Sequence, residues 1–293
     1  MNTHIQRSFI IGEEWIYYKI YLGVKTADLI LINNLKSVLE KLVASYNVDQ
    51  WFFIRYSDPD FHLRLRIHMS NPDQLIHILN LVNKELKELK EKGLIWKVQM
   101  DTYDRELERY GAPIMEQSER LFYYDSLMII NALDVLEEDE NSNLKWLWGL
   151  KIVDKFMDDF GLSIQEKKNL MEDLTASFGQ EFGVGNTAKK QINPKYIQFK
   201  KEIDSVINSA ANDYLFLLLE NKSSSIKGIA KVITQKSHDS AYNINYIISS
   251  HIHMTMNRLF RTKNRKNEFV SYTMLLLYYE SKIARIKYDK NTI

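Results

Sequence analysis

Apolar residues follow two different periods in the first hundred residues of this chain. Four segments, residues 15–22, 51–56, 61–69 and 94–103, are rich in aromatic and β-branched residues or alternate between apolar and polar, which is typical of strands. Residues 26–43, and a segment that opens at Pro72 and closes at Gly93, have apolar residues at helical spacing. The resulting order βαββαβ predicts a ferredoxin-like sheet with its first and third strands in the centre.

Beyond Gly111 helical patterns replace the alternation. They cover residues 115–138, 144–160, 163–178, 194–220, 225–236, 241–261 and 268–286. The fold class predicted is therefore α+β, with an N-terminal ferredoxin-like βαββαβ sheet packed against an all-helical C-terminal half. We expect two subdomains, 1–111 and 112–293, that form one intimate unit with the functional site between them.

Side chains of the strands separate into an apolar face, which would carry the crossover helices, and a cationic face. The cationic face should hold Trp51, Phe53 and Arg55 of the second strand, followed by four residues of the third strand, His62, Arg64, Arg66 and His68. A solvated sheet face would explain this pattern, but its many aromatic residues favour a cleft enclosed by the helical half. Because unpaired buried guanidinium groups are costly, two arginines here predict a bound carboxylate or phosphate.

Composition narrows the classes of function. Lys and Arg number 39 against 38 Asp and Glu, a net charge of +1, which argues against a dedicated nucleic-acid binder. An RNA-recognition sheet has the same strand order, but its glycine- and aromatic-rich third strand is absent from FHLRLRIHM. The chain has no cysteine, no long apolar run and no apolar signal core at its start. We therefore expect a cytoplasmic protein with no membrane span.

Two further segments carry candidate chemistry. Residues 101–111 (DTYDRELERYG) hold Glu106 and Arg109, which would share one face of a helix, although a solvated helix start is the more usual explanation of such a segment. Residues 251–261 are expected to be helical and hold His253 and Asn257 four positions apart. A histidine in such a place is usually structural, yet imidazole is also the usual proton-transfer group at neutral pH. Glycine-rich phosphate loops, HExxH and GxSxG are absent, so we expect no metal and no cofactor.

Three stretches together resemble a known family. RYSDPDFHLRLR, then DTYDRELERYG followed by SERLFYYDS, and HIHMTMNRLF occur in this order in the C-terminal domain of lantibiotic dehydratases and in free-standing relatives from thiopeptide-type bacteriocin pathways. The resemblance runs from Trp15 to about Glu280. Many members have two glycines after R-Y, whereas here Gly111 is followed by Ala112.

The resemblance implies an activity and a set of partners. In this family a glutamylating enzyme that uses glutamyl-tRNA esterifies Ser or Thr of a precursor peptide, made of leader and core, and the C-terminal-type domain eliminates glutamate to leave dehydroalanine or dehydrobutyrine. The glutamylating enzyme would be a separate partner here. A homodimer is left open by the sequence.

The family's eliminating residues fall on five positions of this chain. They are Arg64 and Arg66 of R-x-R, Glu106 and Arg109 of E-x-x-R, and His253 of H-M-x-x-N-R. The arginines would bind the glutamyl group and stabilise its departure, His253 would move the proton, and Glu106 would orient Arg109 or bind the glutamyl ammonium. Side chains expected to contribute to substrate binding are Arg55, His62, Tyr110, Asn257 and Arg258.

Two alternatives remain open. Some free-standing relatives are pyridine synthases, which join two dehydroalanines by a formal aza-[4+2] cycloaddition and close the macrocycle of a thiopeptide. Retention of all three motifs favours elimination over this chemistry. A peptide-binding subunit without catalytic activity is the third reading.

Overall fold

A four-stranded antiparallel sheet forms the N-terminal part of the protein. The computed structural model describes residues 5–138, 143–183, 187–209, 213–240 and 242–291. The sheet contains β2 (Trp15–Leu22), β3 (Val48–Tyr56), β4 (His62–Met69) and β5 (Ile95–Met100), in the order β3-β4-β2-β5. The first and third strands along the chain therefore lie in the centre, as the sequence predicts. Two short strands, β1 (Ser8–Phe9) and β6 (Tyr103–Asp104), pair separately.

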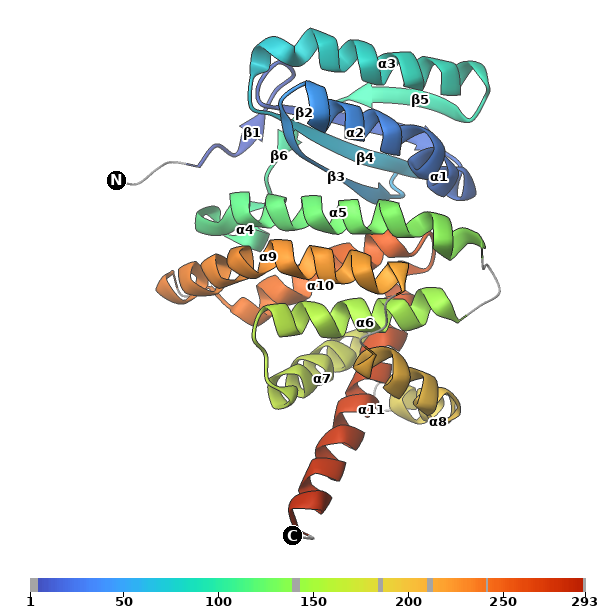
Figure 1. Cartoon of the computed structure of the whole chain (residues 1–293), viewed down its shortest axis with the longest axis vertical. Coiled ribbons are helices and arrows are strands. Elements are labelled where there is room, and N and C mark those ends of the chain that lie inside the picture. The colour runs from blue at the N-terminus through green and yellow to red at the C-terminus, as the bar shows by residue number, and fades with distance from the viewer. Residues whose placement is uncertain (1–4, 139–142, 184–186, 210–212, 241, 292–293) are drawn as a thin grey trace.

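Helices cover one face of this sheet (Figure 1). The connection from β2 to β3 is α1 (Val24–Ile30), one π-helical turn η1 (Leu31–Leu35) and α2 (Lys36–Ser45). The connection from β4 to β5 is the short 3₁₀ turn η2 (Pro72–Gln74) followed by α3 (Leu75–Glu91). Asn71 caps this turn by accepting from the backbone N–H of Asp73, and Pro72 occupies the first helical position.

The rest of the described chain is helical. A short α4 (Leu107–Tyr110) and the 3₁₀ turn η3 (Ala112–Ile114) lead into seven helices. These are α5 (Met115–Glu138), α6 (Leu144–Asp159), α7 (Ile164–Glu181), α8 (Thr187–Asn208), α9 (Tyr214–Asp239), α10 (Ile244–Leu259) and α11 (Asn264–Asn291). The mixed α+β class is thereby confirmed. Within the described residues no helix combines the length and the apolar character that crossing a membrane requires.

The sequence pattern placed two helix boundaries wrongly: the helix predicted to begin at Pro194 begins at Thr187. The pattern also predicts a break between residues 220 and 225, whereas α9 continues through this polar stretch. Instead, α8 ends at Asn208 and α9 begins at Tyr214. Lys222 and Ser223 are buried within α9 because they have polar partners: Lys222 pairs with Asp125 at 2.6 Å, and Ser223 donates to Asp159 at 2.5 Å. Buried ion pairs on a helix interrupt the apolar period that marks a helix in the sequence.

β3 is an edge strand of the sheet, and side chains of the helical half cover its outer edge. The hydroxyl of Ser126 on α5 accepts from the N–H of Phe53 at 3.3 Å, and the Arg258 guanidinium on α10 donates to the Phe53 carbonyl at 2.8 Å. Asn257 accepts from the N–H of Arg55 and donates to its carbonyl, both at 2.9 Å. Side chains of two helices thus satisfy backbone groups that would otherwise lack partners at a sheet edge.

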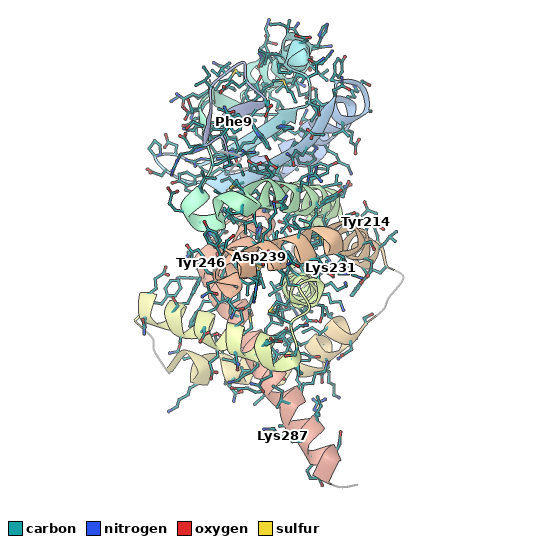
Figure 2. All side chains as sticks on the ribbon, turned by 90° about the vertical axis from the view of Figure 1, so that its left-hand side faces the viewer. Phe9, Tyr214, Lys231, Asp239, Tyr246 and Lys287 are labelled. Atoms are coloured by element: carbon teal, nitrogen blue, oxygen red, sulfur yellow. The ribbon has the colours of Figure 1, made fainter. Side chains whose placement is uncertain are left out.

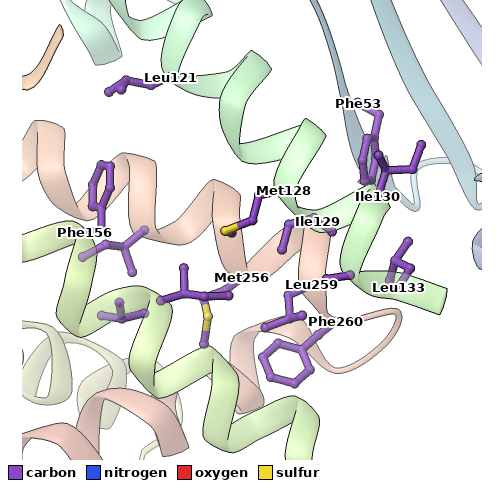
Figure 3. Close-up of a cluster of buried hydrophobic side chains, with 14 of the residues drawn as sticks. Phe53, Leu121, Met128, Ile129, Ile130, Leu133, Phe156, Met256, Leu259 and Phe260 are labelled. Carbon is purple, nitrogen blue, oxygen red and sulfur yellow. The ribbon is translucent and has the colours of Figure 1, made fainter. Parts of the chain in front are cut away.

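Two apolar clusters form the core. The larger joins the helix-covered face of the sheet to α5, α6, α10 and α11 without interruption; Figure 3 shows its members Phe53, Ile130 and Met256. The smaller lies on the opposite face of the sheet. Its members come from the sheet, from β1 and β6, and from α4 and the first turns of α5: Phe9, Trp15, Tyr17, Phe52, Tyr103, Tyr110, Met115 and Phe122.

Candidate functional site

Strict alternation along β4 places Arg64 and Arg66 on the face opposite the helix layer. Across the sheet Arg64 pairs with Lys19 of β2, and Arg66 pairs with Tyr17. On the other side the partners in β3 are Ile54 and Phe52. Cross-strand partners share a face, so this face is cationic and aromatic as predicted.

The prediction was wrong about which β3 residues belong to it. Trp51, Phe53 and Arg55 point to the helix layer, since they pair with the apolar residues Ile67, Leu65 and Leu63, whereas Phe52, Ile54 and Tyr56 lie on the cationic face. WFFIRY is apolar at nearly every position because both faces of β3 are covered. Such a strand has no alternation from which its faces could be assigned.

Arg66 lies in a cage of aromatic rings. Its guanidinium carbon is 4.4 Å from the ring centre of Tyr17, 4.8 Å from that of Tyr103 and 5.3 Å from that of Phe52. The residue is 8% exposed, its Nε has no hydrogen-bond partner, and none of the ion pairs found among the described residues includes it. A buried cation held only by π-faces is suited to binding an anion that enters from outside.

Arg64 is less buried and is held by its neighbours. Its Nε donates to Nε2 of His62 at 3.1 Å, and its guanidinium lies 3.4 Å from the ring centre of Tyr56. Nδ1 of His62 contacts the Asp60 carbonyl at 2.8 Å, which fixes the tautomer with the proton on Nδ1. Burial lowers the pKa of His62, so its ring is neutral and positions Arg64.

A small cavity opens at Arg66. Its volume is about 30 Å³, and its wall includes Phe52, Tyr103, Glu106 and Met254. This is the volume of about one water molecule in the liquid. Arg64, Arg109 and His253, although described by the structure, are not among its lining residues.

Glu106 and Arg109 lie where the chain leaves the sheet for the helices. Glu106 immediately precedes α4, Arg109 lies within it, and their side chains form an ion pair at 3.5 Å with exposed fractions of 61% and 30%. Gly111 ends α4 with a φ of +83°, and a Cβ there would come within 3.0 Å of the Tyr242 ring, which explains the glycine at this position. Arg109 also lies near the ring of Tyr110, a buried member of the smaller apolar cluster.

His253 on α10 is directed at a buried carboxylate. Its Nδ1 lies 2.9 and 3.0 Å from the two oxygens of Glu268 on α11, while its side chain is 27% exposed. Tyr272 also donates to Glu268, at 3.2 Å. With Nδ1–H held in this way, Nε2 is the nitrogen left to accept a proton. Met254, the next residue on α10, lines the Arg66 cavity.

Three of the residues expected to bind substrate have internal partners instead. Arg55 forms a buried ion pair with Asp28 at 2.5 Å on the helix-covered face, and Asn257 holds the β3 edge. Arg258 is 1% exposed and pairs with Asp125 at 2.9 Å. The expectation that Arg55 lies on the cationic face is therefore wrong.

Comparison with known proteins gives the family. The model of the family described as lantibiotic biosynthesis dehydratase C-term matches residues 15–279. The chain belongs to this family. Its relatives include the subtilin biosynthesis protein SpaB of Bacillus subtilis, 26% identical over 91% of this chain, and the nisin biosynthesis protein NisB of Lactococcus lactis subsp. lactis, 27% identical over 90%. The chain spans 26% and 25% of the lengths of these two proteins.

Solved structures share the fold. The tRNA dependent lantibiotic dehydratase MibB from Microbispora sp. 107891 aligns with a TM-score of 0.68 and 19% identity, over 94% of this chain and 29% of MibB. The pyridine synthase TbtD from thiomuracin biosynthesis aligns with a TM-score of 0.61 and 12% identity, over 92% of this chain and 98% of TbtD.

In this member of the dehydratase C-terminal family, sequence reasoning missed two groups beside the site. Glu268 had no motif to mark it, because its contact with His253 joins two helices. His251 is the buried histidine of HIH, and its Nε2 contacts the Ser118 hydroxyl at 3.3 Å. Burial, with the charge of Arg258, lowers the pKa of His251 to about 3, so it stays neutral. Among the described side chains no three His, Asp or Glu residues converge as a metal site would require.

Proposed function

We propose that this protein eliminates glutamate from glutamylated Ser and Thr residues of a ribosomally made precursor peptide. The observation that carries the proposal is Arg66, a nearly buried guanidinium without an anionic partner among the described residues, beside a cavity that Glu106 also lines. A glutamyl ester brings an α-carboxylate, and its departure releases a second carboxylate. Both are anions that arginine recognises through paired donors.

In the proposed reaction a base removes the Cα proton of the esterified residue and the Cβ–O bond breaks. The products are a dehydroamino acid residue and free glutamate, which leaves with its γ-carboxylate charged. Arg66, Arg64 and Arg109 would bind the glutamyl group and stabilise this developing charge, and such donors commonly contribute about 3–4 kcal/mol each to transition-state stabilisation. Glu106 would orient Arg109 or bind the ammonium group.

His253 is the proposed proton-transfer residue. Glu268 accepts from Nδ1 and leaves Nε2 free to take the proton, and this histidine–carboxylate pair is the arrangement that orients imidazole bases in many enzymes. Met254, the next residue of α10, lines the Arg66 cavity and His253 does not, so in this proposal the imidazole would act from beyond the cavity wall. Because the cavity is small, the Glu106–Arg109 ion pair would open to admit a glutamyl group.

The proposal also covers the position of the site in the fold, the partner enzyme and the cellular location. We place the site between an N-terminal subdomain, residues 1–111, and a helical subdomain, residues 112–293. The strand order β3-β4-β2-β5 supports assigning the first to the ferredoxin-like class. A separate enzyme that uses glutamyl-tRNA would supply the ester, which puts the reaction in the cytoplasm. A homodimer remains compatible with this proposal.

A direct assay tests the activity. The protein is mixed with a glutamylated precursor peptide, and loss of one glutamic acid per modified site is followed by mass spectrometry. His253→Ala and Arg66→Ala are expected to leave the esters intact, because one removes the base and the other the anion contact. Full turnover by these variants would refute the assigned roles, and an inactive wild-type protein would refute elimination.

A second candidate is pyridine synthesis, the activity of TbtD, whose fold this chain shares. The 26–27% identity to SpaB and NisB, against 12% to TbtD, supports elimination instead. The two are separated by giving the protein a dehydrated linear peptide. Loss of water and of the leader peptide would support the synthase, whereas no change with either peptide would leave a binding subunit.

A further inference from the structure

A cavity with a strongly cationic wall lies where the end of β3 and the turn to β4 meet the loop from α10 to α11. It holds about 350 Å³, at the small end of the range of ligand-binding pockets. Its lining residues are Arg55, Ser57, Phe61, Phe182, Arg261, Thr262, Lys263, Asn264, Arg265 and Lys266. Half of them are Lys or Arg, and no Asp or Glu of the described chain is among them. This cavity therefore favours an anionic ligand.

The arginines of this wall are already balanced by carboxylates behind it. The partners are Asp28 for Arg55 and Arg261, and Glu181 and Glu268 for Arg265. Three guanidinium groups thus face three carboxylates. The arginines contribute donors to the wall but little net charge.

The two lysines carry the surplus of positive charge. Lys263 ends the loop and Lys266 lies in the first turn of α11, and both are exposed. Neither forms an ion pair with any acidic side chain that the structure describes. Their ammonium groups are therefore available to a ligand from outside and leave the wall with two unbalanced positive charges.

The size and surroundings of the cavity indicate what kind of anion fits. A nucleic acid is a poor match, because the whole chain has a net charge of only +1 and the two aromatic rings of the wall, Phe61 and Phe182, are partly buried and offer little face for base stacking. Two acidic side chains of a peptide bring two charges in a volume of this size. Carboxylates are also the natural partners of the Lys and Arg donors that line it.

Contacts connect this cavity to the candidate site. Glu268 lies 2.9 Å from Nδ1 of His253 and 3.5 Å from Arg265, which lines the cavity. At the turn after β3, Ser57 lines the cavity, and the guanidinium of Arg64 lies 3.4 Å from the ring centre of the preceding Tyr56. A peptide bound at the candidate site would thus have neighbouring residues beside this cavity.

We propose that this cavity binds acidic side chains of the peptide substrate, with Lys263 and Lys266 as the residues that select them. The identity of the peptide as substrate rests on the proposed function, whereas the preference for acidic side chains does not. The acidic residues would lie a few positions from the Ser or Thr that carries glutamate. Peptides without them would bind less tightly.

The test uses the full chain and two unreactive probes. Both are end-blocked dodecapeptides of Ala, Ser and Thr, one with Asp-Asp at its centre and the other with Asn-Asn, and their binding is compared by calorimetry at low ionic strength. The Asp-Asp peptide should bind about five- to tenfold more tightly, because it adds two partly exposed ion pairs. This preference should shrink as salt is added. The double variant Lys263→Gln, Lys266→Gln should bind both peptides equally.

The matched control is Lys287→Gln, which removes the same charge near the other end of α11 (Figure 2) and should keep the preference of the wild type. Equal binding of the two peptides by the wild type, or an equal loss of preference in Lys287→Gln, would overturn the inference. Binding of dodecauridylate that depends on Lys263 and Lys266, without a preference between the peptides, would also overturn it.

The glutamate assay separates this inference from the proposed function. With a glutamylated peptide that carries acidic neighbours, the double variant should raise KM about fivefold, as expected from the loss of the same ion pairs. A wild-type protein that prefers the Asp-Asp peptide but releases no glutamate would refute the proposed function alone and support acidic-peptide binding.

Discussion

The arginines of this protein have two distinct roles that look alike in the sequence. Arg55 and Arg258 are buried and paired with Asp28 and Asp125. Arg66 is almost as buried but contacts aromatic rings in place of a carboxylate. The difference lies in long-range contacts, so only the structure separates arginines that hold the fold from one available to an anion.

Glu268 allows a test of the proposed base at the level of one residue. Glu268→Gln keeps the size of the side chain but replaces the carboxylate that accepts from His253 Nδ1. We expect kcat for glutamate elimination to fall about 10–100-fold with little change in KM, measured by mass spectrometry. Tyr272→Phe, which removes another hydrogen bond to Glu268, is the control and should retain kcat. If both variants behave alike, Glu268 is structural and does not orient His253.

At the scale of elements, the contact between α10 and the edge of β3 joins the two halves. Asn257 binds both backbone groups of Arg55, and Arg258 binds the carbonyl of Phe53. These side chains belong to the same H-M-x-x-N-R segment as His253. Two of its residues thus fix the helix to the sheet, and their position fixes the backbone that carries the imidazole.

Asn257→Ala tests this structural role. It leaves the N–H and C=O of Arg55 without their partners, and we expect the free energy of unfolding to fall by about 2–4 kcal/mol in urea titrations. Asn169→Ala on the surface of α7 is the matched control and should change it by less than about 0.5 kcal/mol. KM for the glutamylated peptide should stay unchanged in Asn257→Ala. A raised KM with normal stability would instead show that Asn257 binds substrate.

The elements that sequence reasoning predicted well are those with a clear period. Residues 115–138 are helical as predicted, and β4 alternates as its pattern requires. The faces of β3 could not be predicted, since WFFIRY is apolar on both sides. The candidate site was predicted only in part: alternation placed Arg64 and Arg66, but the partners of His253 and Arg55 lie on distant segments. Contacts of that kind leave no local pattern.

For the whole molecule, the buried His251 contributes to the loss of stability in acid. Its pKa of about 3 in the folded protein lies below the value near 6.5 expected for an unfolded chain. Between these values the unfolded chain binds a proton that the folded protein does not. Stability from this residue is therefore present above pH 6.5 and is lost as the pH falls, by about 1.4 kcal/mol per pH unit.

His251→Gln should flatten this acid dependence. Urea titrations between pH 6.5 and 4.5 are expected to show a smaller loss of unfolding free energy per pH unit than in the wild type. His238→Gln is the control, because the side chain of His238 is 92% exposed. Identical slopes for His251→Gln and the wild type would show that His251 takes up its proton without unfolding.

The helix contacts at β3 also depend on the register of the hairpin that β3 and β4 form. Only residues 53 and 55 present to α5 and α10 the backbone groups that Ser126, Asn257 and Arg258 bind. If β3 slipped by one residue, these groups would turn inward and Phe52 would leave the side of Arg66. The helical half can therefore pack only against a hairpin that has the native register. Chains with a shifted register never form the aromatic cage around Arg66.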